Sequence, residues 1–230
     1  MFPKAILIGS IGVVAETSDI QRRAYNQAFR EAGLDWHWDV ETYKDLLKQN
    51  GGRDRLRTLS FETNADLSEK QVLAIHARKT DIACAEIIED GVDLRPGVVE
   101  LLTMAAQEGA KLAFVTTTYR QNIDAIAQGA RPKLDLNGFD AIMTTNDVEQ
   151  TKPHPEIYEK ALNRLSLKPG ECLAIEDSET SLKAAKAAGI ETIITPGQFT
   201  IGQDFSLADA VYTDISVWCE HMTQSVVAAE

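Results

Sequence analysis

The stretch CLAIEDSETSLKAAKAAGI, residues 172–190, shows how this chain is built, because a short apolar run leads directly into a helical pattern. The apolar run reads as a buried strand that ends in Glu176 and Asp177. Ser178 is a residue type that begins helices, the next segment is rich in alanine, and Gly189 is a residue type that ends them. We therefore expect a buried strand followed by a helix.

Other Val/Ile/Leu-rich runs of the same kind recur along the chain, with helical stretches between them. They lie at residues 5–9, 111–116, 139–144, 191–195 and 209–213. Buried runs that alternate with helices are typical of a parallel sheet covered by helices on both faces. The sequence thus predicts an α/β fold with a Rossmann-like parallel core.

The long segment between the first two of these runs contains no convincing strand. Apolar residues recur there at helical spacing, in residues 20–32 and again in residues 68–87. We predict that residues 17–90 form a helical cap domain, inserted after the first strand of a core made of residues 1–16 and 91–230. This layout places a ligand site in the cleft between cap and core.

Composition limits the possible partners. The chain has 230 residues, a net charge of -12 and 44% hydrophobic residues, and its acidic field argues against nucleic acid and anionic membranes as partners. Three scattered cysteines without metal-type spacing favour free thiols and a cytoplasmic location. An anionic ligand would therefore need a locally positive pocket.

Glu176 and Asp177 are candidate metal ligands. Two acids at the carboxyl end of a strand stand where Mg²⁺ is commonly held, since Mg²⁺ prefers carboxylate oxygens. The same two acids would also favour the positive end of the following helix. Spacing alone leaves both interpretations open.

Two further segments carry candidate phosphate ligands. In TKPHPEIYEKAL, residues 151–162, Lys152 precedes a Pro-x-Pro turn that can aim its ammonium at a phosphate. In FVTTTYRQN, residues 114–122, a strand ends in threonines whose hydroxyl and N–H groups can bind phosphate at a helix start. A surface lysine and an ordinary N-cap cluster are the alternative interpretations.

Taken together, these motifs resemble the haloacid dehalogenase superfamily of phosphatases and phosphomutases. Residues 24–56 and 94–102 look most like CbbY-type phosphatases, relatives of β-phosphoglucomutase. The resemblance implies phosphate binding by Thr116, Thr117 and Lys152, and Mg²⁺ binding by Glu176 and Asp177. It also implies that the segment GGRDR, residues 51–55, contacts substrate through Gly52, Arg53 and Arg55.

That segment belongs to a positively charged stretch. Five cations stand against Asp45 and Asp54 between Lys44 and Arg57, namely Lys44, Lys48, Arg53, Arg55 and Arg57. A solvated helix face with charge pairs is the alternative to a substrate-binding surface here.

The chain departs from the family at its first strand, where the family has two aspartates. The resemblance places Gly9 at the position of the nucleophile and Ile11 at that of the general acid and base. Strand alternation would turn Ser10 away from the face of Gly9, and Glu16 lies several residues further on, so neither is a substitute. Loss of the nucleophile removes the covalent route.

We expect a family member that has lost phosphatase activity and binds a phosphoester such as a sugar phosphate, or acts as a regulatory pseudoenzyme. Loss of two carboxylates changes the net charge of the pocket by +2, so a phosphate could bind without metal, and Mg²⁺ binding is expected to be weak or absent. One alternative is a phosphatase in which Glu176 or Asp177 activates a water molecule. A second alternative is a scaffold that binds a protein partner, whose identity the sequence does not give.

Overall fold

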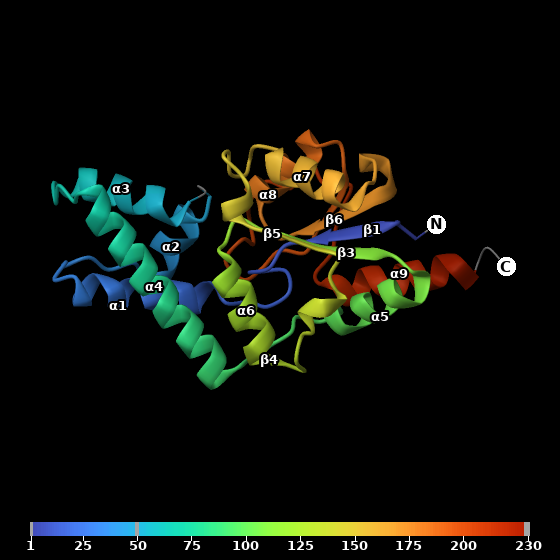
Figure 1. The fold of residues 1–230 in the computed structure, drawn as a ribbon, viewed down its shortest axis with the longest axis horizontal. Coiled ribbons are helices and arrows are strands. Elements are labelled where there is room, and N and C mark those ends of the chain that lie inside the picture. Colours follow the sequence, from blue (N-terminus) through green and yellow to red (C-terminus); the bar gives the residue numbers. More distant parts are fainter. Residues whose placement is uncertain (1, 49–50, 228–230) are drawn as a thin grey trace.

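A six-stranded parallel sheet forms the centre of the molecule, in a computed structural model that describes residues 2–48 and 51–227 (Figure 1). The strand order is β5-β3-β1-β6-β7-β8. The strands are β1 (Ala5–Ile8), β3 (Lys111–Val115), β5 (Ala141–Met143), β6 (Cys172–Glu176), β7 (Glu191–Ile194) and β8 (Ala210–Val211). Each strand lies within one of the apolar runs, so the predicted α/β fold is confirmed.

Strand β1 lies in the middle of this sheet and is completely buried. It pairs in parallel with β3 on one side and β6 on the other, with Ala5 opposite both Lys111 and Cys172. Ile6 and Ile8 join the apolar cluster on one face, whereas Ala5 and Leu7 join the cluster on the other. The absence of charge in this strand follows from burial on both faces.

Helices cover both faces of the sheet (Figure 1). The helices α5 (Val98–Glu108), α6 (Arg120–Gly129) and α9 (Ile215–Val227) contribute to the cluster on one face. The helices α7 (Glu156–Leu165) and α8 (Glu179–Ala187) contribute to the cluster on the other. Helix α8 begins after Ser178, as its residue types predict.

Four helices follow the first strand and lie to one side of the sheet (Figure 1). They are α1 (Ser18–Glu31), α2 (Val40–Leu46), α3 (Gly52–Glu62) and α4 (Glu69–Asp90). Their shared core is aromatic, with ring centroids of Tyr25 and Trp38 4.6 Å apart and those of Phe29 and Trp38 4.9 Å apart. These helices fall in the segment assigned to the cap, whose boundaries stay a prediction.

A second, small sheet corrects the expectation of no strand before residue 111. Strand β2 (Val92–Asp93) pairs in parallel with β4 (Ala130–Arg131). A strand of two residues is too short to show an alternating hydrophobic pattern. Three 3-10 turns complete the elements: Leu136–Gly138, Thr145–Asp147 and Pro169–Glu171. Within residues 2–48 and 51–227, none of the helices combines the length and the apolar character needed to cross a membrane.

Gly97 allows α5 and α9 to approach each other, and this contact gives the first testable prediction. Gly97 has a φ of +86°, and a Cβ there would overlap the backbone of Ile215 and Ser216. Gly109 has a φ of +65° with nothing within 4 Å of an added Cβ. Alanine at either site strains the backbone, but only Gly97→Ala adds overlap. We expect Gly97→Ala to lower the free energy of unfolding by about 1–3 kcal/mol more than Gly109→Ala.

Urea denaturation of the two variants beside the parent protein measures this difference. Equal losses of stability in the two variants would show that α9 can pack beside α5 even when residue 97 has a Cβ.

Candidate functional site

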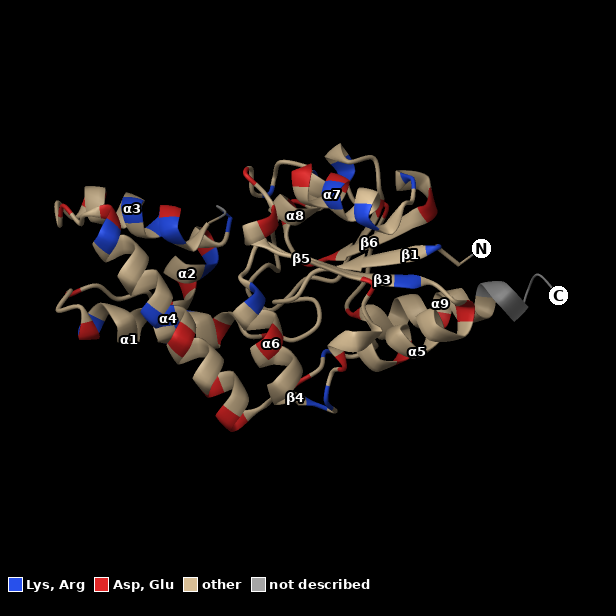
Figure 2. Cartoon of the chain, in the orientation of Figure 1, with Lys and Arg blue, Asp and Glu red and all other residues tan. Residues whose placement is uncertain are grey.

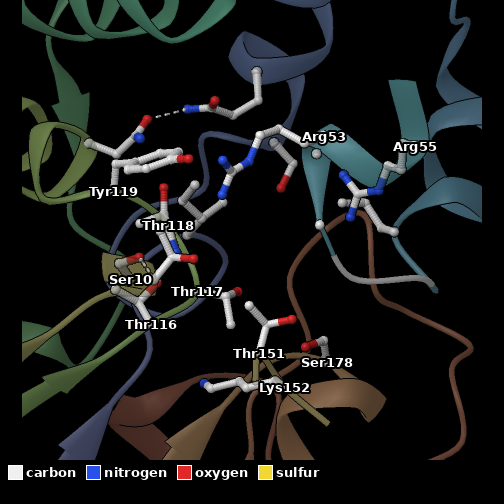
Figure 3. A pocket seen from close by; sticks show the side chains of 18 of the residues that line it. Ser10, Arg53, Arg55, Thr116, Thr117, Thr118, Tyr119, Thr151, Lys152 and Ser178 are labelled. Atoms are coloured by element: carbon white, nitrogen blue, oxygen red, sulfur yellow. Dashed lines mark hydrogen bonds between the residues drawn. The ribbon is translucent and has the colours of Figure 1, made fainter. Parts of the chain in front are cut away.

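A pocket of about 360 Å³ lies where the loops after β1, β3 and β6 meet helices α3 and α4. All the residues singled out from the sequence line it: Gly9, Ile11, Gly52, Arg53, Arg55, Thr116, Thr117, Lys152, Glu176 and Asp177. Figure 3 shows Arg53 and Arg55 on the wall formed by α3, opposite the threonines and Lys152. The structure therefore brings these residues together, and their roles stay predictions.

The space beside Gly9 is filled by other side chains. A Cβ built on Gly9 would lie 2.6 Å from Glu176 Oε2 and 2.8 Å from Val13 Cγ2. Both distances are shorter than a normal contact. Ile11 is half-buried and packs against the apolar cluster below it. The end of the first strand thus has no carboxylate of its own and is closely packed around the carboxylate of Glu176.

Ser10 lies in the pocket, contrary to the expectation that it turns away. Its hydroxyl is 2.9 Å from the hydroxyl of Thr116, and its side chain is buried. Strand β1 ends at Ile8, so strand alternation does not extend to residue 10. Ser10 therefore helps to position the hydroxyl of Thr116, which also accepts a hydrogen bond from the N–H of Thr118.

Lys152 forms a buried ion pair with Glu176. The ammonium of Lys152 lies 2.5 Å from Glu176 Oε1, and both side chains are only 2% exposed. The same ammonium donates to the carbonyl of Val115 at 2.9 Å and contacts the hydroxyls of Tyr158 and Ser181 at 3.2 and 3.4 Å. A phosphate that binds Lys152 must therefore compete with Glu176 for the ammonium.

Tyr158 completes this network and was missed in the sequence. Its hydroxyl donates to Glu176 Oε1 at 2.5 Å. Burial, with a further contribution from the charge of Glu176, holds the pKa of Tyr158 well above its ordinary value. The only available signal was its place six residues after Lys152, on the buried side of α7. Glu176 Oε1 thus accepts from two donors while Oε2 lies beside Gly9.

Asp177 is a half-buried acid with a raised pKa. Burial raises its pKa from 3.8 to about 8, and the charges of Glu176 and Glu16 act in the same direction. Its carboxyl also lies 3.4 Å from the hydroxyl of Thr200. A protonated carboxyl is a poor ligand for a cation.

The donors do not fit a Mg²⁺ ion. In the described part of the chain, no three or more His, Cys, Asp or Glu side chains are grouped so that they could hold a metal. Glu176 is already paired with Lys152, and the raised pKa of Asp177 disfavours the carboxylate form that a cation binds. Mg²⁺ requires several oxygen ligands in octahedral geometry. Weak or absent Mg²⁺ binding stays a prediction, which these donors favour.

Three of the five cations between residues 44 and 57 line the pocket, namely Arg53, Arg55 and Arg57, and Lys44, Lys48 and Arg57 form ion pairs at the surface. Figure 2 shows Lys and Arg positions along α3. The surface pairs are Lys44 with Glu41, Lys48 with Asp45, and Arg57 with Asp54 and Glu69. The guanidinium of Arg53 lies 5.7 Å from the ring of Tyr119, and that of Arg55 lies 6.0 Å from the ring of Tyr43. The charge-pair interpretation therefore holds for Lys44, Lys48 and Arg57, and substrate contact by Arg53 and Arg55 stays a prediction.

Gly52 is needed for close packing at the pocket wall. A Cβ at this position would overlap the hydroxyl of Tyr25 and would lie 2.6 Å from His76 Nε2. Gly52 therefore lets the start of α3, which carries Arg53 and Arg55, lie close against α1 and α4.

Helix α4 adds His76 and Lys79, which were missed in the sequence. Both line the pocket. Burial and the nearby charges of Lys79, Arg53 and Arg55 lower the pKa of His76 to about 3, so its ring is neutral. The signal that could have found them is the helical repeat that places both beside the buried residues Val72 and Ile75.

The fold and the pocket define a Rossmann-like α/β protein with a ligand site at the carboxyl edge of its sheet. A family model described as haloacid dehalogenase-like hydrolase matches residues 3–189, so the chain belongs to that family.

The relatives include CbbY proteins. Protein CbbY of Rhodobacter capsulatus is 40% identical over 93% of this chain and 94% of its own length, and the Cupriavidus necator plasmid protein is 39% identical over 98% and 91%. The crystal structure of CbbY from Rhodobacter sphaeroides in complex with phosphate has a TM-score of 0.88 and 35% identity, covering 94% of this chain and 96% of that chain. A mutant of the same protein, in complex with xylulose-(1,5)bisphosphate, matches equally well.

Asp177 gives a prediction on pH dependence. Because its pKa is raised on folding, the folded protein binds more protons than the unfolded chain between about pH 4 and pH 8. The stability that this group contributes is complete below that range and is lost as the pH rises through it. We therefore expect Asp177→Asn to become more stable than the parent as the pH rises across this range.

Denaturant unfolding of both proteins at several pH values, in a chelator, measures this trend. If the difference in free energy of unfolding between parent and variant stayed constant across this pH range, Asp177 would be ionised in the folded protein.

Proposed function

We propose that this chain binds a phosphoester of the sugar-phosphate class and has lost the family's covalent route of hydrolysis. The observation that carries the proposal is the end of the first strand, where residue 9 is glycine and Glu176 with Val13 fills the space of a side chain. The cap and core boundaries, the cytoplasmic location and a regulatory role belong to the same proposal.

The two family positions at the end of the first strand carry no group for the chemical step. A covalent route needs a nucleophile, and Gly9 has no side chain, while Ile11 cannot carry a proton. Burial raises the pKa of Asp177 to about 8, so a minor share of this carboxyl is ionised at neutral pH. Glu176 accepts hydrogen bonds from Lys152 and Tyr158. These contacts argue against the alternative in which Glu176 activates water.

The remaining groups suit an anionic, hydroxylated ligand. Hydroxyls of Ser10, Thr116 and Thr117 line the core side of the pocket, and Arg53 and Arg55 line the opposite side. Guanidinium groups bind phosphate oxygens in pairs, and hydroxyls donate to the same oxygens. The complexes of CbbY with phosphate and with xylulose-(1,5)bisphosphate support a phosphorylated ligand.

Binding without turnover is the main test. We expect inorganic phosphate and sugar phosphates to raise the melting temperature, because a ligand that binds only the folded state stabilises it. Arg53→Met removes a charge at the pocket and should weaken binding about ten-fold, the value of one charge-assisted hydrogen bond. Lys70→Met, a change at an exposed position of α4, is the matched control.

The same samples are assayed with p-nitrophenyl phosphate and Mg²⁺. We expect no hydrolysis above background. Turnover that depends on Mg²⁺ and disappears in Lys152→Ala would refute the proposal, whereas absence of any ligand effect would favour the scaffold that binds a protein partner.

Restoring the aspartates tests whether the strand end can accept them. Gly9→Asp with Ile11→Asp places a second carboxylate against Glu176 and a side chain against Val13. We expect the free energy of unfolding of this double variant to be about 1–3 kcal/mol lower than that of the parent. The single variant Ile11→Asp changes a half-buried position, so its free energy of unfolding should fall by less. A fully stable and hydrolytic double variant would show that Glu176 and Val13 leave the space readily.

A further inference from the structure

Lys79 is a buried cation that the proposed binding mode does not use. Its side chain is 7% exposed and lines the pocket from α4. In the part of the chain that the structure covers, its ammonium has no hydrogen-bond acceptor and no carboxylate partner, and it lies 4.8 Å from the centre of the Tyr25 ring. Buried lysines are normally paired with an acid. Lys79 therefore contributes no ion pair to the fold.

The surroundings of Lys79 favour its neutral form. Arg55 lies near enough to repel a second positive charge, and burial removes the water that would solvate one. Together they lower the pKa of Lys79 from 10.5 to about 7. His76 in the same wall is neutral and supplies no compensating negative charge. A neutral amine in a pocket is a nucleophile, as in lysines that lie in apolar surroundings beside other cations.

We propose that the amine of Lys79 forms an imine with the carbonyl group of a phosphorylated aldehyde or ketone bound in this pocket. The lone pair of Nζ attacks the carbonyl carbon and forms a C–N bond, while the π electrons move to the carbonyl oxygen. The two amine protons leave with that oxygen as water, and a C=N bond remains. The step needs no oxidant or reductant, and water reverses it.

The pocket limits the ligand to one chemical class. This inference rests on the proposed function, since the hydroxyls of Thr116 and Thr117 and the guanidinium of Arg53 would hold the phosphoryl group. Lys79 stands on the cap side of the same pocket. A compound with a phosphoryl group and a free carbonyl, such as the open-chain form of a sugar phosphate, can engage both. A purely electrostatic role for Lys79 would leave no covalent product.

Pyridoxal 5′-phosphate, which carries an aldehyde and a phosphoryl group, is the probe. The full chain is incubated with it, reduced with borohydride to fix any imine, and digested for mass analysis of each lysine. We expect labelling at Lys79 at least about ten-fold faster than at the exposed Lys70 of the same helix, because a larger fraction of its amine is neutral. Excess inorganic phosphate should slow labelling at Lys79 and leave Lys70 unchanged.

The variants Lys79→Arg and Lys70→Arg separate the outcomes. Loss of the fast label in the first variant alone supports the proposal. Labelling of Lys79 at the rate of Lys70, or none at all, overturns it, whatever the phosphate-binding assay shows. Phosphate binding is measured separately by melting temperature, so that failure of the imine and failure of the proposed function give different results.

Discussion

The ion pair between Lys152 and Glu176 is the interaction on which the site depends. A buried pair is stable only when both partners are present, since removal of either leaves an unpaired charge that costs about 3–5 kcal/mol. The pair joins the loop before α7 to the end of β6, and its ammonium also holds the carbonyl of Val115 at the end of β3. It therefore fixes the carboxyl edge of the sheet and places Glu176 beside Gly9.

The same pair sets the charge of the pocket. On the core side, Lys152 and Glu176 neutralise each other, and the pKa of Asp177 is raised. Positive charge on the pocket wall comes instead from α3, where Arg53 and Arg55 line the pocket. From the sequence alone, the positive character of the pocket is attributed to the two missing carboxylates of the first strand. In the structure, the cations on the pocket wall opposite that strand supply it.

The fold was largely predictable because buried parallel strands are continuous apolar runs, and parallel strands end at one edge. That rule predicts where Lys152, Thr116 and Glu176 meet. It does not predict which side chains touch there. The hydrogen bond from Tyr158 to Glu176 and the position of Ser10 depend on contacts between distant segments. Charge counts likewise cannot separate Arg53 from Lys44, because pairing is set by three-dimensional neighbours.

The close packing around Gly9 has a consequence for any substitution at this position. Val13 and Glu176 already occupy the volume that any side chain at position 9 would need. A carboxylate at that position becomes acceptable only after these neighbours have changed or moved. An aspartate at position 9 therefore requires a shift of both the Glu176 and the Val13 side chain, so this strand end and β6 would have to adjust together.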